Sequence, residues 1–400
     1  MQRPQLHPDE DRGARALSTV VDTHTHFIPL EFVEFLRTGG EGMGLEVVDR
    51  DGRDPLVAHD NGLQYPVFGL FHDPAEKLAA MDRDGIDMSL SSISPSLFLY
   101  ELEPAQTLRA HQVINDAGVS YAERSGGRIA MLATVPMNDP ELAAQELRRA
   151  VGELGYVGVE IGPRVGDTML DDEGLDVFWT AVTELDVPVM LHPYMNMVSK
   201  PGPDLRGYHL ANVVGNPFET YVAACRLIVG GVFDRHPTLR VQLVHAGGAF
   251  AYQVGRLSHA YEAREDTREV AERDPMDYLD RFLFDTIIFD PVGLKFLLER
   301  AGPDAVLFGT DLPFDMADLS PLETLPKIAD PPRPRRPWAA TPCAPTSSRR
   351  RLRPRACAAV RRPRRRGGHR PRTARRRRRA WARRTRRARA RRRWPRAGPA

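Results

Sequence analysis

The stretch VDTHTHFIP (residues 21–29) places two histidines, His24 and His26, at the end of an apolar run and just before a proline. In an extended segment, side chains two residues apart lie on the same face, so both imidazoles should point the same way. Two neutral imidazoles a few ångströms apart suit a divalent transition metal ion. A polar strand end with two surface histidines gives the same pattern, because His-x-His often occurs by chance. The rest of the sequence has to distinguish these two interpretations.

Short apolar or β-branched runs recur along the chain and alternate, for the most part, with helical patterns. There are eight of them, at residues 20–27, 87–93, 128–136, 156–163, 187–193, 240–247, 282–289 and 305–311. Near-continuous apolar strands separated by amphipathic helices predict a parallel sheet that is buried on both faces. Eight such units predict an α/β fold, a TIM (β/α)8 barrel over residues 20–330. Long loops are inserted after the first strand (38–73) and the fifth (194–217), and we expect the first to lie over the barrel mouth.

Polar residues stand at the same end of several predicted strands. Strand one ends in His24 and His26, strand five in His192, strand six in His245 and strand eight in Asp311. TIM-barrel active sites lie at the carboxyl ends of the strands, so these side chains are expected to meet there. The chain has only 12 histidines, which makes a chance arrangement hard to credit. Three imidazoles and a carboxylate suit zinc, manganese or iron.

Composition narrows the class of protein. The chain is 42% hydrophobic, enough for a large core, and its three cysteines are too few and scattered for a disulfide framework. Residues 1–19 mix both charge signs and lack the apolar core of a signal peptide, so we expect a flexible segment there. The sequence contains no run of 18 or more apolar residues, so it predicts no membrane span. A cytoplasmic location is therefore expected.

The charge balance changes sharply after Asp330. Of the 56 lysines and arginines, 29 are arginines in residues 331–400, where no acidic residue occurs. Residues 1–330 contain the other 27 basic residues and all 53 acidic ones. The tail is rich in Arg, Pro and Ala, cannot bury a core and is predicted to be disordered. It could bind nucleic acid or an anionic membrane. The complete absence of lysine favours a third interpretation, an out-of-frame translation of a GC-rich gene, which leaves only nonspecific nucleic-acid binding.

Three stretches resemble the amidohydrolase superfamily, in particular its branch typified by aminocarboxymuconate semialdehyde decarboxylase. They are DTHTHFIP (22–29), GGVFDRHPTLRVQLVHAGGAFAYQVGRLSHA (230–260) and FDTIIFDPVGLKFLLERAGPDAVLFGTDLPF (284–314). The resemblance implies that one divalent ion, with zinc expected ahead of manganese or iron, is held by His24, His26, His192 and Asp311. It also implies that His245 acts as the general acid/base.

The resemblance extends to substrate recognition, with gaps. Arg256 in VGRLSHA resembles an arginine that reaches a substrate carboxylate from the neighbouring subunit, which implies a homodimer. Tyr194 stands where the family has a tryptophan near the substrate. The enzyme after which the branch is named has a lysine and an arginine in its first insertion, but residues 59–74 contain neither. We therefore expect a relative that acts on another small carboxylic acid.

The expected reaction is the nonoxidative decarboxylation of an aromatic or unsaturated carboxylic acid. Loss of carbon dioxide leaves electrons on carbon, and a divalent ion beside a carbonyl or phenolate oxygen stabilises that charge. His245 would move a proton to or from the substrate carbon. The same ligand set could serve the hydrolysis of a lactone or amide, which stays open as an alternative. An inactive barrel with a nucleic-acid-binding tail is a third, less favoured possibility.

Overall fold

Eight parallel strands form one sheet in the order β1-β5-β6-β7-β10-β11-β12-β13. The computed structural model describes residues 19–60, 62–194 and 205–319. The strands are β1 (Val21–Phe27), β5 (Met88–Ile93), β6 (Ile129–Thr134), β7 (Gly158–Ile161), β10 (Val189–Leu191), β11 (Val241–Leu243), β12 (Phe282–Asp285) and β13 (Val306–Leu307). Each lies within one of the eight predicted runs and is shorter than that run.

Backbone hydrogen bonds between the first strand and the segment after the last one close the barrel. Thr23 N donates to Phe308 O at 2.8 Å, and Asp311 N donates to His24 O at 2.8 Å. His26 N donates to Leu312 O at 2.7 Å. The predicted TIM-barrel fold is therefore confirmed, and its closure lies where His24, His26 and Asp311 are found.

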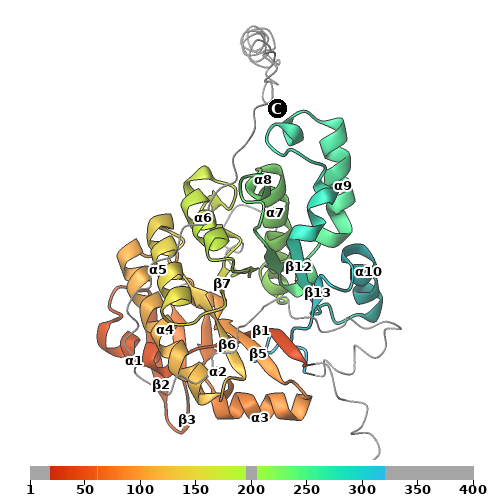
Figure 1. Ribbon diagram of the computed structural model, residues 1–400. Coiled ribbons are helices and arrows are strands. Elements are labelled where there is room, and N and C mark those ends of the chain that lie inside the picture. The colour runs from red at the N-terminus through yellow and green to blue at the C-terminus, as the bar shows by residue number, and fades with distance from the viewer. Residues whose placement is uncertain (1–18, 61, 195–204, 320–400) are drawn as a thin grey trace, which may run out of the picture. The chain divides into compact units, whose positions relative to one another are not determined.

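Helices surround the strands, as Figure 1 shows. They are α1 (Leu30–Gly39), α2 (Gly69–His72), α3 (Pro74–Asp84), α4 (Pro104–Arg124), α5 (Pro140–Gly152), α6 (Asp176–Glu184), α7 (Asn216–Val229), α8 (Val232–Arg235), α9 (Phe250–Ala263) and α10 (Pro291–Ala301). Three begin at an Asp-Pro pair, in which the side chain of Asp73, Asp139 or Asp290 accepts a backbone N–H of the first turn. Aspartate caps free N–H groups and proline needs none at that position, so the sequence itself sets these helix starts.

Short turns connect these elements and shape the barrel ends. The 3-10 turns are Pro95–Leu97, Glu173–Leu175, His245–Gly247, Asp266–Arg268 and Pro275–Arg281, and Ala211–Gly215 forms a π-helical turn before α7. The pair β8 (Arg164–Val165) and β9 (Thr168–Met169) forms a small hairpin after β7. The turn His245–Gly247 follows β11 directly and belongs to the site described below.

The core has an outer and an inner part. Large aromatic side chains fill the space between strands and helices, among them Phe178, Trp179, Phe233, Phe250 and Phe282. A separate small cluster comes from five different strands or their ends: Leu90, Leu132, Met190, Val244 and Leu307. Inward side chains of a TIM barrel pack in this way, so the barrel interior is filled.

The insertion after the first strand contains a three-stranded antiparallel sheet, formed by β2 (Leu45–Arg50), β3 (Arg53–His59) and β4 (Gln64–Pro66). The last part of the insertion, after this small sheet, lies beside the carboxyl end of β1. The Phe71 ring lies 5.6 Å from the Phe314 ring, and Phe314 lies 5.0 Å from the His26 ring. These contacts agree with the expected position of residues 38–73 at the barrel mouth.

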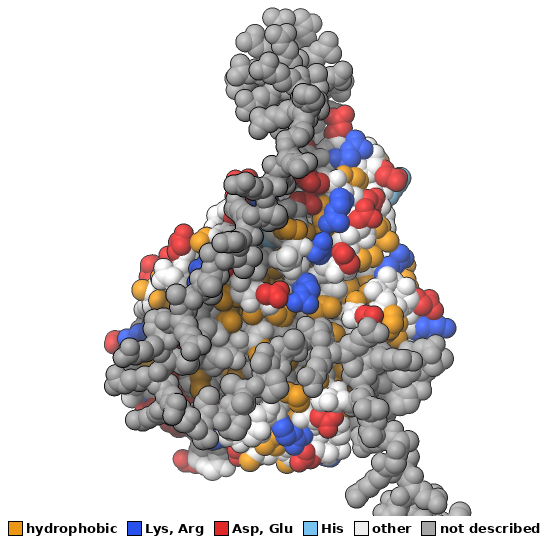
Figure 2. Space-filling model, viewed as in Figure 1, with side chains coloured by type: hydrophobic (Ala, Val, Ile, Leu, Met, Phe, Trp, Pro, Cys, Tyr) orange, Lys and Arg blue, Asp and Glu red, His pale blue; other side chains and the backbone are white. Residues whose placement is uncertain are grey.

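Several predictions concern segments outside the described residues. These are the N-terminal segment, residues 195–204 of the second insertion, and the arginine-rich tail. Among the described helices, none is long and apolar enough to cross a bilayer. Figure 2 shows acidic and basic side chains interspersed over the described part of one face.

Candidate metal centre

His24 and His26 converge as their spacing predicts. Both side chains are fully buried, and their Nε2 atoms lie 3.1 Å apart. Their rings are nearly perpendicular, with centroids 5.0 Å apart. The strand therefore presents both imidazoles to one point inside the barrel mouth, and the interpretation as a surface strand end is wrong.

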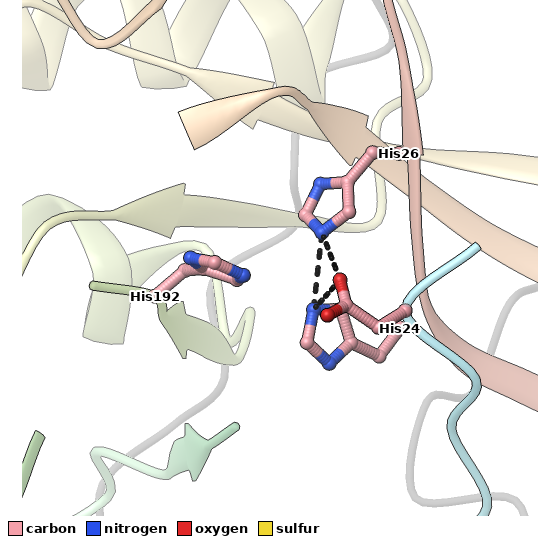
Figure 3. A group of neighbouring side chains, drawn as sticks. His24, His26 and His192 are labelled. Carbon is pink, nitrogen blue, oxygen red and sulfur yellow. Dashed lines mark hydrogen bonds and ion pairs between the residues drawn. The ribbon is translucent and has the colours of Figure 1, made fainter. Parts of the chain in front are cut away.

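His192 and Asp311, which come much later in the chain, lie next to this pair of histidines. His192 follows β10 and Asp311 lies four residues after β13, and both are buried. Asp311 Oδ1 lies 3.1 Å from His26 Nε2 and 3.4 Å from His24 Nε2. One ligand atom from each of the four residues lies within 4.8 Å of the others. Figure 3 shows the three labelled histidines directed toward one another.

The outer nitrogen of each imidazole determines its tautomer. His192 Nδ1 faces Pro193 O at 2.7 Å, and His26 Nδ1 faces Ile93 O at 3.1 Å. His24 Nδ1 lies 2.8 Å from an oxygen of Asp285. Carbonyl and carboxylate oxygens only accept, so all three Nδ1 atoms carry a proton and the three Nε2 atoms face inward, where a bound cation would take their lone pairs. His192 Nε2 has no hydrogen-bond partner among the described residues. Three lone pairs and a carboxylate aimed at one point fit a divalent cation.

Electrostatics at the centre favour positive charge. Burial lowers the pKa of His24, but the charges of Asp311 and Asp285 outweigh it and raise the value to about 9. Burial lowers the pKa of His26 to about 4, and burial together with the neighbouring imidazoles holds the pKa of His192 well below its usual range. The pKa of Asp311 is well below its usual value, because the charge of His24 overcomes the opposing effect of burial. The centre therefore attracts one positive charge but keeps two imidazoles neutral, as metal ligands must be.

His245 lies at the edge of this cluster. Its Nε2 is 3.5 Å from Asp311 Oδ2, and its ring centroid is 5.1 Å from that of His192. The side chain remains 16% exposed, whereas those of His24 and His26 are fully buried. The structure thus brings His245 next to the four grouped residues but leaves it in contact with solvent, as a proton-exchanging group requires.

The two residues expected to bind substrate occupy different environments. Tyr194 is partly buried two residues after His192, and its hydroxyl donates to Arg164 O at 3.1 Å. Its ring packs against those of Phe98 and Tyr100. Arg256 is exposed on α9 and makes no ion pair within the described part of the chain. Tyr194 therefore borders the mouth, whereas Arg256 is exposed to solvent on α9.

Three further buried groups border the site. Glu160 lies on β7 with Oε1 3.9 Å from His26 Nδ1 and outside the four-residue group. Burial raises the pKa of Glu160 well above its usual value. Asp285 and Lys77 were not found by sequence reasoning. Asp285 ends strand seven in FLFDTIIF (282–289) and could have been found by its place at a strand end, but nothing in the local sequence singles out Lys77.

A closed parallel barrel with this centre at the carboxyl ends of its strands defines a metal-binding TIM barrel. The chain belongs to the amidohydrolase family, whose model matches residues 21–333. A 2-amino-3-carboxymuconate-6-semialdehyde decarboxylase from Dictyostelium discoideum is 32% identical over 314 residues, covering 78% of this chain and 87% of the relative. A gamma-resorcylate decarboxylase from Polaromonas sp. strain JS666 is 30% identical over 256 residues, covering 60% of this chain and 77% of the relative.

A solved structure supports the same family assignment. The dihydroxybenzoic acid decarboxylase from Polaromonas sp. JS666, with bound manganese and the inhibitor 2-nitroresorcinol, matches with a TM-score of 0.61 and 25% identity. The match covers 78% of this chain and 92% of that one. The resemblance read from the sequence, to the decarboxylase branch of the amidohydrolases, is therefore confirmed, and metal binding is a property of at least this relative.

Proposed function

We propose that this protein is a metal-dependent nonoxidative carboxy-lyase that acts on an aromatic or unsaturated carboxylic acid. The observation that carries the proposal is the convergence of three inward Nε2 atoms and Asp311, with His245 beside them and open to solvent. The relatives named above, all decarboxylases, support this reaction over the hydrolysis of a lactone or amide.

His24, His26, His192 and Asp311 would hold one divalent ion. When bound, the ion would supply a Lewis acid that stabilises negative charge on a substrate oxygen. Zinc is favoured by the three imidazoles, and the manganese in the Polaromonas structure supports manganese as the alternative. The buried walls of the mouth would exclude bulk water from the reacting carbon and so strengthen these electrostatic effects.

The chain's own residues would carry out the proton transfer. As the bond from the substrate carbon to its carboxylate breaks, the electron pair stays on that carbon and carbon dioxide leaves. His245 Nε2 would deliver a proton to the carbon and would regain a proton from solvent after the product leaves. Asp311 would orient the imidazole through the 3.5 Å contact of Oδ2 with Nε2.

Substrate binding and assembly form the second half of the proposal. Tyr194 would line the mouth, and Arg256 would bind a substrate carboxylate in a neighbouring subunit, with the bidentate geometry that guanidinium allows. Exposed apolar side chains on or next to the helices around Arg256 support a homodimer through this side: Val213, Val214, Phe218, Tyr252, Phe289 and Val292. A cytoplasmic location is part of the same proposal.

A substrate screen tests the proposed function. Protein loaded with zinc or manganese is incubated with a panel of carboxylated phenols and muconate-type acids, and evolved carbon dioxide is measured. A parallel panel of lactones and amides covers the hydrolytic alternative, and His192→Ala serves as the inactive control. Metal-dependent carbon dioxide release from at least one acid is expected. Hydrolysis of a lactone or amide without decarboxylation of any acid would replace the lyase by the hydrolase.

A further inference from the structure

We propose that Asp285 is a positioning residue that fixes the metal ligand His24 and the acid/base His245 in position relative to each other. The roles of these two histidines rest on the proposed function. Asp285 ends β12, and its side chain is fully buried. It belongs neither to the four grouped ligands nor to the residues that would touch substrate.

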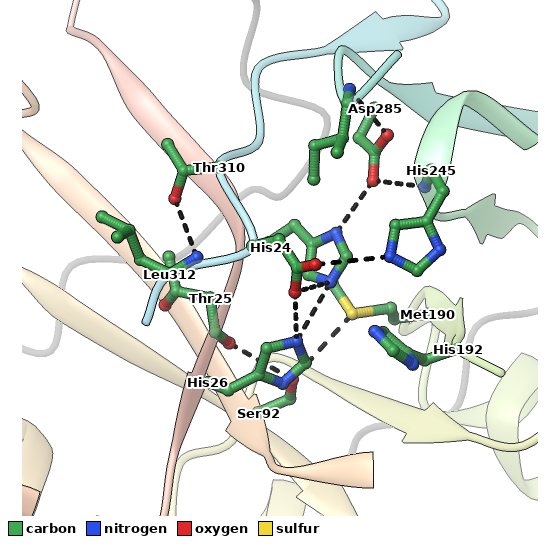
Figure 4. Close-up of polar contacts among 12 residues, drawn as sticks. His24, Thr25, His26, Ser92, Met190, His192, His245, Asp285, Thr310 and Leu312 are labelled. Atoms are coloured by element: carbon green, nitrogen blue, oxygen red, sulfur yellow. Dashed lines mark hydrogen bonds and ion pairs between the residues drawn. The ribbon is translucent and has the colours of Figure 1, made fainter. Parts of the chain in front are cut away.

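The carboxylate of Asp285 accepts four N–H groups from three segments. Oδ2 lies 2.8 Å from His24 Nδ1 and 2.9 Å from His245 N. Oδ1 accepts Ala246 N at 2.7 Å and Ile287 N at 3.1 Å. Figure 4 shows Asp285 between His24 and the backbone of His245, with the His245 ring directed back toward the metal ligands. A single side chain thus connects the ends of β1, β11 and β12.

The turn that carries His245 depends on this carboxylate. His245 and Ala246 have φ angles of +54° and +55°, in the left-handed region that side chains other than glycine rarely adopt. Successive N–H groups in such a turn point to the same side and form a small anion-binding concavity. Asp285 fills it with a fixed negative charge. The carboxylate therefore offsets the strain that places the His245 ring next to Asp311.

The same carboxylate also fixes the tautomer of His24. Because Asp285 is hydrogen-bonded to Nδ1, the proton stays there and the Nε2 lone pair is free for the metal. An asparagine at this place would keep the size of the side chain, but one of its two ends would donate. That end would oppose either His24 Nδ1–H and His245 N–H, or Ala246 N–H and Ile287 N–H.

Asp285→Asn tests the proposal, with Asp290→Asn as the matched control. Asp290 lies five residues further along and caps α10 by accepting Gly293 N. Apo-protein is titrated with Co²⁺, which needs no substrate and so remains informative if the carboxy-lyase function proves wrong. Asp285→Asn should weaken Co²⁺ affinity by roughly 10–100-fold and alter the d–d absorption bands. Asp290→Asn keeps an oxygen that caps α10 and should leave both the Co²⁺ affinity and the absorption bands unchanged. Unchanged affinity and spectrum in Asp285→Asn would overturn the role at His24.

Turnover at saturating metal tests the role at His245. We expect kcat of Asp285→Asn to stay below wild type when every site is filled, with KM changed much less. Adding Ala246→Gly should restore part of kcat but none of the metal affinity, because glycine adopts positive φ without strain. Wild-type kcat in metal-saturated Asp285→Asn, or no recovery with Ala246→Gly, would show that Asp285 does not position His245.

A measurement on the unmodified chain covers the case in which Asp285→Asn does not fold. In zinc-loaded protein with ¹⁵N-labelled histidine, ¹H–¹⁵N spectra should show a proton on His24 Nδ1 that exchanges slowly with solvent. An unprotonated or rapidly exchanging Nδ1 would contradict the proposal.

Discussion

The Nζ atom of Lys77 donates a 2.8 Å hydrogen bond to the backbone oxygen of His26. Lys77 lies on α3, is only 3% exposed and also reaches Ser91 Oγ at 3.3 Å. Burial lowers the pKa of Lys77 to about 7, an effect that the charge of Asp22 partly opposes. A buried lysine thus holds the end of the strand that carries two metal ligands.

Lys77→Met should destabilise the barrel. Methionine keeps the length of the side chain but leaves the buried His26 oxygen without its donor, and a buried acceptor without a partner costs about 1–3 kcal/mol. We expect the free energy of unfolding in urea to fall by that amount. Lys295→Met is the matched control, because Lys295 is exposed on α10 and its contact with Glu299 is a surface ion pair. Equal stability of the two variants would show that the bond to His26 contributes nothing.

Histidine variants should separate metal binding from proton transfer. Protein purified without chelator should carry close to one zinc, manganese or iron ion per subunit by elemental analysis. His192→Ala should lose most of that metal, because it removes an inward Nε2 atom. His245→Ala should keep the metal but lose turnover by about 10²–10⁴-fold, the usual contribution of general acid/base catalysis. Loss of the metal in His245→Ala would instead make it a ligand, and full activity of metal-free protein would exclude a catalytic metal.

Subunit mixing should reveal whether Arg256 serves the neighbouring site. In a dimer of Arg256→Ala and His24→Ala chains, one site would combine an intact metal centre with the partner's arginine. Random mixing should then restore about a quarter of wild-type activity in a two-fold symmetric dimer. A mixture of His24→Ala with His245→Ala is the control and should stay inactive, because both residues belong to the same subunit's site. No recovery in the first mixture would place Arg256 in its own subunit or outside the site.

The buried His111 should make stability depend on pH. His111 lies fully buried on α4, and burial lowers its pKa to about 4 from 6.5. The unfolded chain therefore binds a proton near pH 6.5 that the folded chain takes up only near pH 4. The neutral form favours folding, so this contribution is present above pH 6.5 and is lost as the pH falls toward 4.

His111→Gln removes this contribution and provides the test. Between pH 7 and pH 5 the wild type should lose roughly 1–2 kcal/mol more unfolding free energy than the variant, from about 1.4 kcal/mol per pKa unit. Comparing the two proteins cancels the pH dependence of the metal ligands. Parallel pH profiles of stability for the wild type and the variant would contradict the expected proton uptake.

The sequence alone determined the fold and the residues that meet at the centre. Strand periodicity places His24 and His26 on one face whatever the rest of the chain does, because extended side chains alternate. Parallel strands of a barrel share one carboxyl end, so His192, His245 and Asp311 had to lie near that pair once the eight runs were recognised. These inferences use local geometry and chain order only.

Only the tertiary structure decided how those residues are held. Asp285 contacts His24 and His245 across 261 and 40 residues of chain, and Lys77 contacts His26 across 51. A lone aspartate at a strand end and a lysine on an amphipathic helix have many uses, and neither carries a local signal for burial. The positive φ of His245 and Ala246 likewise follows from a carboxylate supplied by another strand. Long-range packing chooses these partners, because the free energy of burying a charge depends on the whole surrounding fold.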